Sequence, residues 1–209
     1  MRSQSMHSPD LHDTTRSNQL SRLALADAQS LAIRKLLSKS AQESSLHPGP
    51  PLPKSHPSPV LIAKLYLEIT EFLTAAKSLA KTPGSTPSSS SKFKFGKKDK
   101  DKDLGEDLTV HGEVSSELRR YLSDEGLFFS AMSYKWLGVD AGEQGKAGEA
   151  VGFLKWAKEQ LDSLGGGGKE KERNRGRKER IAEEVRSVDT FLKGYTKEND
   201  TVSLFSLQV

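Results

Sequence analysis

The chain has 209 residues, enough for one domain of moderate size, with 34% hydrophobic and 29% charged residues. It contains no cysteine, which excludes disulfides, thiolate zinc sites and a cysteine nucleophile. The formal net charge of +4 does not by itself indicate a nucleic-acid-binding protein.

No apolar run approaches the ~20 residues that a membrane-spanning helix needs, and the first residues, MRSQSMHSPDLHD, lack the apolar segment of a signal peptide. We therefore expect a cytoplasmic protein. Residues 1–18, 43–58, 82–112 and 163–178 are rich in Pro, Gly, Ser or charged residues. Such segments bury too little surface to offset the entropy of ordering, so we expect them to stay loose.

Five helices are predicted, and the first covers residues 13–42, where no Gly or Pro interrupts the chain. Its apolar side chains recur at three- and four-residue steps, which predicts a core-facing stripe of Leu20, Leu23, Ala24, Ala28, Leu31 and Leu36. The connector LHPGPPLPKSHPSP cannot be helical because of its prolines. The second helix begins at Pro59, behind the capping residue Ser58, and ends near Lys81. Its core stripe is predicted to be Ile62, Tyr66, Ile69, Leu73, Ala76 and Ala80.

The third and fourth helices are predicted over residues 112–137 and 146–164. The third has bulky residues on one face, namely Leu118, Leu122, Phe129, Met132 and Trp136. The fourth directs Ala150, Phe153, Leu154, Ala157 and Leu161 inward. Small residues of the fourth helix, Ala150, Gly152 and Ala157, would let the two backbones approach closely, as in a tetratricopeptide-type hairpin.

The fifth helix is predicted to begin in the charged run KEKERNRGRKER, with a stripe of Ile181, Val185, Val188 and Leu192. The last residues, NDTVSLFSLQV, are expected to be extended. Strands nowhere alternate with helices, so the predicted fold class is all-α, built from antiparallel helical hairpins.

Catalytic patterns are missing from the sequence, and we expect no enzyme, no metal site and no cofactor. The five histidines lie in predicted loops and form no HxxxH pair. The glycines of GEQGKAGEA lack the preceding strand and the GK[ST] ending of a phosphate-binding loop, so they indicate an interhelical turn. Four acids are expected to lie on solvated helix faces: Asp124, Glu125, Asp140 and Glu143.

A basic and aromatic stretch, SKFKFGKKDKDKD, lies in the linker between the second and third helices. Its candidate contact residues are Lys92, Phe93, Lys94, Phe95, Lys97 and Lys98. This composition suits an anionic lipid surface and also suits single-stranded nucleic acid, but a solvated loop without a partner is the favoured interpretation.

The second helix carries more apolar residues than one core stripe requires. Leu61 and Leu65 are rotated from the stripe by roughly 60–100°, and Val60 and Phe72 widen the apolar band. Either this helix is buried on most sides, or it leaves an apolar strip for a partner.

Four stretches occur in the order expected of a Bro domain: ADAQSLAIRKL, LIAKLYLEITEF, GEAVGFLKWAKEQL and NDTVSLFSLQV. Residues 19–205 resemble the later half of that domain, with residues 82–111 as a flexible insertion, residues 1–18 as a disordered segment and residues 206–209 as the end. KFKFGKKDKDKDLGEDL and KWLGVDAGE resemble the branch of the family that acts in fungal signalling at ambient alkaline pH. The resemblance implies a tetratricopeptide-like helical core.

The resemblance also implies a function. Bro domains bind the C-terminal amphipathic helix of the ESCRT-III polymerising subunit on an apolar patch, which falls here at Ala32, Leu61 and Leu65. Ala32 is smaller than the aromatic residue common in the family, and its neighbour Ile33 is expected to compensate. Lys64 is placed to meet acidic residues of the partner.

The implied protein is a non-catalytic adaptor. It links a pH-signalling complex at the plasma membrane to ESCRT-III and is recruited peripherally to the plasma membrane or endosomes. The alternatives are membrane or nucleic-acid binding through the Lys/Phe-rich stretch, and a truncated paralogue without the activity.

Overall fold

The computed structural model describes residues 11–46, 48–79, 116–165 and 175–206. These ranges contain six helices and no strand: α1 (Leu11–Ser38), α2 (Ala41–Leu46), α3 (Pro59–Leu79), α4 (Ser116–Glu143), α5 (Ala147–Gly165) and α6 (Arg175–Ser206). The predicted all-α class is confirmed.

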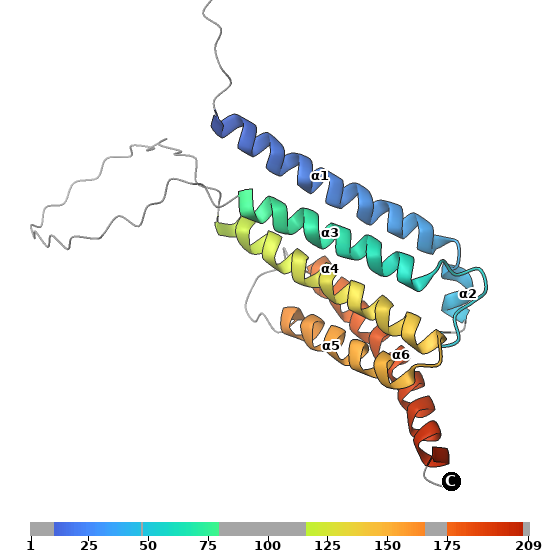
Figure 1. The fold of residues 1–209 in the computed structure, drawn as a ribbon. Helices are drawn as coiled ribbons and strands as arrows, with labels where there is room; N and C mark the ends of the chain where they lie inside the picture. Colours follow the sequence, from blue (N-terminus) through green and yellow to red (C-terminus); the bar gives the residue numbers. More distant parts are fainter. Residues whose placement is uncertain (1–10, 47, 80–115, 166–174, 207–209) are drawn as a thin grey trace, which may run out of the picture.

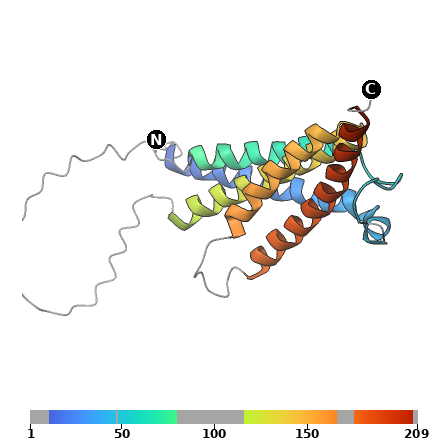
Figure 2. The ribbon, with the colours of Figure 1, turned by 90° about the horizontal axis from the view of Figure 1, so that it is seen from below.

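Four long helices lie side by side in one layer, in the order α1, α3, α4, α5, each antiparallel to the next (Figure 1). The fifth long helix, α6, packs mainly against α5 and less extensively against α4 (Figure 2). Within the described residues α1 packs only against α3 and the short α2. The layer is therefore closed by α6 at one end and left open along α1 at the other.

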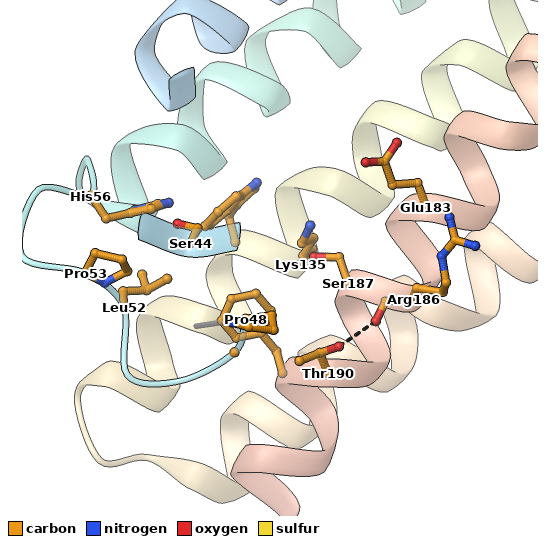
Figure 3. Close-up of a pocket in the computed structure, with 13 residues that line it drawn as sticks. Ser44, Pro48, Leu52, Pro53, His56, Lys135, Glu183, Arg186, Ser187 and Thr190 are labelled. Atoms are coloured by element: carbon orange, nitrogen blue, oxygen red, sulfur yellow. Dashed lines mark hydrogen bonds between the residues drawn. The ribbon is translucent and has the colours of Figure 1, made fainter. Parts of the chain in front are cut away.

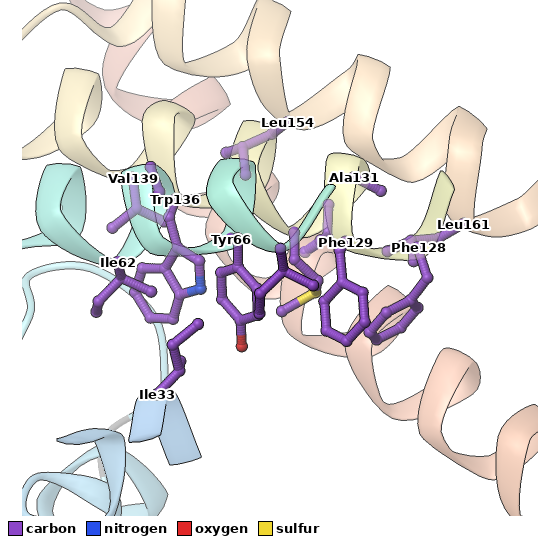
Figure 4. Close-up of a cluster of buried hydrophobic side chains, with 14 of the residues drawn as sticks. Ile33, Ile62, Tyr66, Phe128, Phe129, Ala131, Trp136, Val139, Leu154 and Leu161 are labelled. Carbon is purple, nitrogen blue, oxygen red and sulfur yellow. The ribbon is translucent and has the colours of Figure 1, made fainter. Parts of the chain in front are cut away.

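The core lies between α3 and α4, which share the most extensive contact of any two helices in the described ranges. Ile62, Tyr66, Ile69, Leu73 and Ala76 of α3 are all buried, as their helical spacing predicts. The same holds for Leu122, Phe129, Met132 and Trp136 of α4. Figure 4 shows side chains from α1, α3, α4 and α5 meeting in this cluster. Burial of these aromatic and aliphatic side chains, about 1.5–3 kcal/mol each, is the main stabilising term.

The predicted core stripe of α1 is wrong for four of its six residues, while Leu23 and Leu36 are half-buried against the core. Leu20 and Leu31 are 65% and 62% exposed, and Ala24 and Ala28 are also exposed. The buried residues recur instead at seven-residue steps: Gln19, Ala26, Ile33 and Ser40. A seven-residue repeat keeps a narrow seam facing a single neighbouring helix, which is what α1 has in α3.

Close packing of α4 on α5 depends on Gly138, where a Cβ would lie 2.8 Å from Leu154 Cγ. Ala150 and Ala157 face this contact and are fully buried. The predicted role of small residues is confirmed for these two alanines. It is wrong for Gly152, which is exposed and has open space around its Cα.

Several boundaries differ from the prediction. Helix α1 begins at Leu11, inside the segment expected to be disordered, and α4 continues past the predicted Leu137 to Glu143. The chain leaves α1 at Ser38 and forms the separate short helix α2 before the prolines. At the other end, α6 continues through Ser206, so residues 199–206 are helical and not extended. No Gly or Pro follows Gly194, so nothing in the sequence stops the helix there.

Candidate partner-binding site

Four of the five residues predicted to bind a partner, Ala32, Leu61, Lys64 and Leu65, lie on one flank of the contact between α1 and α3. We call this surface strip the α1/α3 groove. Leu61 is 45% exposed, Ala32 and Lys64 are exposed, and Leu65 is half-buried against the core. The relative position of α1 and α3 along their axes follows from Gln29 of α1, whose side-chain amide donates to the backbone oxygen of Leu65 at 3.5 Å. Because the two helices are antiparallel, Ala32 lies level with the turn of α3 that carries Leu61 and Leu65.

Ile33 does not belong to this groove. Its side chain is 0% exposed and points from α1 towards Ile62, Tyr66 and Trp136 (Figure 4). The expectation that Ile33 contacts a partner is therefore wrong, because successive residues of a helix point about 100° apart. Ala32 is exposed for the same reason that Ile33 is buried.

The groove extends further than the sequence predicted. Leu25, seven residues before Ala32 and hence on the same flank of α1, is 48% exposed. Phe72 of α3 is half-buried on the flank that also carries Leu65. At the rim, the Gln29 amide also donates to the Glu68 carboxylate, and Lys64 is exposed. The seven-residue spacing of Leu25 and Ala32 was the sequence signal for this extension.

The second group of candidate residues, Lys92, Phe93, Lys94, Phe95, Lys97 and Lys98, lies outside the described residues.

The face that carries α6 contains two neighbouring hollows. One, of about 400 Å³, is lined by the Pro-rich loop with Leu52 and His56, by Lys135 and Trp136 of α4, and by α6 (Figure 3). The other, of about 450 Å³, is bounded by α1, α2, α3, α4 and α6. Glu183 of α6 lines both hollows, so they adjoin.

Ion pairs connect α6 to the layer across this face. Glu125, one of the acids expected to be solvated, is 5% exposed and accepts hydrogen bonds of 2.7 and 2.8 Å from Arg180. The Arg180 guanidinium also lies 4.1 Å from the ring centroid of Phe128. Lys135 is 4% exposed and pairs with Glu184 at 2.7 Å. Such buried charges need partners, because an unpaired charge in the core is strongly destabilising.

His56 lies between the hollow and the core. Its Nδ1 donates to the backbone oxygen of Pro57 at 2.7 Å, and its ring centroid lies 5.1 Å from that of Trp136. Burial lowers the pKa of His56, partly opposed by the hydrogen bond to Pro57 and by the nearby Glu143. The imidazole is therefore a neutral packing group at neutral pH.

The described part of the chain contains no cluster of three or more His, Asp or Glu side chains able to hold a metal ion. None of its helices combines the length and apolar character needed to cross a bilayer.

Comparison with known proteins identifies the family. The profile of the BRO1-like domain matches residues 1–206. The chain belongs to the BRO1-like domain family. It is 39% identical over 206 residues to the pH-response regulator protein palC of Cryptococcus neoformans var. neoformans serotype D (strain B-3501A). The match covers 88% of this chain and 42% of that relative, so this PalC-like Bro-domain chain spans less than half of the relative's length. No solved structure matches.

In this Bro domain, the two stretches ADAQSLAIRKL and LIAKLYLEITEF fall on α1 and α3, the helices that form the groove. Their apolar residues divide between two roles. Ile33, Ile62 and Tyr66 stabilise the helix pair from within, while Leu61, Leu65 and Ala32 border its outer groove.

Proposed function

We propose that this Bro-domain chain is a non-catalytic adaptor in the response to ambient alkaline pH, recruited peripherally to the plasma membrane or endosomes. Its partner is the C-terminal amphipathic helix of the ESCRT-III polymerising subunit, which docks in the groove between α1 and α3. The similarity to a pH-response regulator supports the pathway. The observation that carries the partner is the exposed Leu61 beside the half-buried Leu65 on a helix that already has a complete core stripe.

The groove has the features that an amphipathic helix requires. Such a helix is anchored by a few apolar side chains at helical spacing. Leu61 and Leu65 are four residues apart on α3, and Leu25 and Ala32 are seven apart on α1, so each helix contributes an apolar edge. The small side chain of Ala32 makes the apolar strip shallow at this position. Lys64 at the rim favours acidic residues there and contributes to orientation more than to affinity.

The test is a fluorescence anisotropy titration of the labelled C-terminal peptide of the ESCRT-III subunit with the full chain and two variants. Leu61→Asp introduces a charge that the docked helix would desolvate, so the dissociation constant should rise at least about tenfold. The matched control is Leu67→Asp, on the same helix and 48% exposed but on the other flank of α3. This control should bind as the parent does, and circular dichroism should give equal helicity for all three proteins.

Two outcomes would contradict the proposal: equal loss of binding in both variants, or unchanged binding by Leu61→Asp. The dependence of binding on salt concentration distinguishes this proposal from the alternative, in which the Lys/Phe-rich stretch binds the partner. Docking in an apolar groove should depend weakly on salt, whereas binding through the lysines of residues 92–98 should weaken steeply between about 50 and 200 mM salt. The Debye length changes roughly twofold over this range.

A further inference from the structure

The α1/α3 groove has one charged residue in the middle of its apolar strip. On α3 the positions 61, 65, 68 and 72 follow each other at steps of four, three and four residues, so they lie along one stripe of the helix. Three of these positions hold the apolar Leu61, Leu65 and Phe72, and the fourth holds Glu68. Glu68 is exposed and lies between the leucines and the phenylalanine. A helix that docks along the whole strip must therefore cover the Glu68 carboxylate.

The facing stripe of α1 repeats this arrangement. Its positions 25, 29, 32 and 36 have the same spacing, and Gln29 is the polar residue among Leu25, Ala32 and Leu36. The side-chain amide of Gln29 donates to the Glu68 carboxylate, which holds that carboxylate against α1. Since the two helices are antiparallel (Figure 1), the two polar residues lie at one level of the groove, with apolar residues on both sides along its length.

Only hydrogen-bond acceptors are left at this polar level. The Gln29 amide donates both to Glu68 and to the backbone oxygen of Leu65, so it has no N–H group to spare. Within the described ranges the Gln29 carbonyl oxygen accepts no hydrogen bond, and Glu68 has no ion pair, although Lys64 is one turn away on α3. The level therefore carries one uncompensated negative charge. Covering such a carboxylate is costly unless the covering group supplies a counter-charge.

We propose that Glu68 determines which helix the groove accepts: the docked helix presents a lysine or arginine to Glu68, flanked on both sides by apolar anchors. This inference rests on the proposed function, since it concerns the same groove. The stripe from Leu61 to Phe72 is eleven residues long, so the partner must offer a matching stripe of about 16 Å at a rise of 1.5 Å per residue. One polar position within an apolar strip also fixes the alignment of the two helices, because only one register pairs it.

The test is an anisotropy titration of the C-terminal ESCRT-III peptide and of a set of its variants, in which each lysine or arginine in turn is replaced by glutamate. Glu68→Lys replaces an attraction by a repulsion, so it should raise the dissociation constant of the unmodified peptide about tenfold. One of the exchanged peptides should bind the parent chain about tenfold more weakly and bind Glu68→Lys within about threefold of the original pair. A residue with a merely structural role would not give this restoration.

The matched control is Glu159→Lys, which makes the same change in net charge at an exposed position of α5, on the far side of the layer from α1 (Figure 1). It should leave the dissociation constant of the unmodified peptide within about twofold of the parent value. The inference is wrong if Glu159→Lys weakens binding as much as Glu68→Lys does, or if no exchanged peptide restores binding to Glu68→Lys.

Leu61→Asp, titrated in the same series, separates this inference from the proposed function. If Leu61→Asp weakens binding and Glu68→Lys does not, the groove remains the docking site and the role of Glu68 is wrong. If the parent chain shows no saturable binding, or if Leu61→Asp binds as the parent does, both proposals are wrong. Circular dichroism should give equal helicity for all variants, since Glu68, Glu159 and Leu61 all lie at exposed positions.

Discussion

The hydroxyl of Tyr195 on α6 donates a hydrogen bond of 2.9 Å to Glu143 Oε1 at the last residue of α4. The same oxygen accepts the backbone N–H of Leu52 at 3.2 Å from the Pro-rich loop. One carboxylate therefore joins three segments that are far apart in the sequence. Leu52 also lines the hollow of Figure 3, so this junction helps to position one wall of that hollow.

Because Tyr195 lies so close to Gly142, adding one methyl group should destabilise the protein at Gly142 and not at another glycine of the same helix. A Cβ at Gly142 would lie 2.2 Å from Tyr195 Cζ, so Gly142→Ala must displace the ring and break the bond to Glu143. We expect its free energy of unfolding to fall by about 2–3 kcal/mol in urea denaturation. The matched control, Gly126→Ala in the same helix, meets nothing within 4 Å and should gain about 0.5–1 kcal/mol from helix propensity. Equal effects at both glycines would contradict the close approach.

The buried pair of Lys135 and Glu184 predicts a second stability effect. Lys135 is 4% exposed, and Glu184→Gln leaves its ammonium group without a counter-charge. We expect the free energy of unfolding to fall by about 3 kcal/mol. The control is Glu179→Gln, which breaks the exposed pair with Arg175 at 76% and 66% side-chain exposure and should be nearly neutral. Comparable urea midpoints for both variants would show that Lys135 has found water or another partner.

His56 predicts a pH dependence of stability. Its pKa in the folded protein is lowered by burial, so between that value and the ordinary value near 6.5 the unfolded chain binds more protons than the folded one. Stability should therefore fall as the pH drops below about 6.5, by at most about 1.4 kcal/mol per pH unit for one proton. His56→Phe keeps the ring contact with Trp136 and should lack this loss. Urea denaturation of parent and variant at pH 8 and pH 5 checks it, and parallel pH profiles would contradict it.

The sequence predicted the interior helices better than the edge helix. In α3 and α4 the apolar residues form one dense stripe, and neighbours on both sides bury it. In α1 the apolar residues surround much of the helix, so periodicity alone does not say which flank α3 covers. The buried residues even include the polar Gln19 of α1 and Ser40, just after the end of that helix.

The buried charges could not be predicted from neighbouring residues in the sequence, for a different reason. From the sequence alone Glu125 is interpreted as a surface acid, because its partner Arg180 is 55 residues further along the chain. The hollow beside Tyr66 is likewise lined by residues from five helices. In contrast, the 60–100° offset of Leu61 from the core stripe was visible in the sequence, and that residue is 45% exposed.

The contrast between Ala32 and Ile33 gives the last prediction. Ala32 is exposed in the groove, so Ala32→Phe should deepen the apolar edge without disturbing the core. Roughly 40 Å² of additional apolar contact at about 25 cal/mol per Å² gives about 1 kcal/mol, or a fivefold lower dissociation constant for the ESCRT-III peptide. Ile33→Ala instead opens a cavity at a fully buried site and should lower the free energy of unfolding by about 2–5 kcal/mol.

Anisotropy and urea denaturation on the same two proteins separate these effects. Ala32→Phe should change affinity with an unaltered urea midpoint. Ile33→Ala should lower the urea midpoint. At temperatures where this variant remains folded, its dissociation constant for the peptide should stay within about twofold of the parent value. A twofold change corresponds to well under the roughly 1.4 kcal/mol of a tenfold change. A weaker affinity in Ala32→Phe would mean that the partner needs the small side chain. It would also mean that the partner helix crosses α1 at Ala32 more closely than a phenylalanine allows.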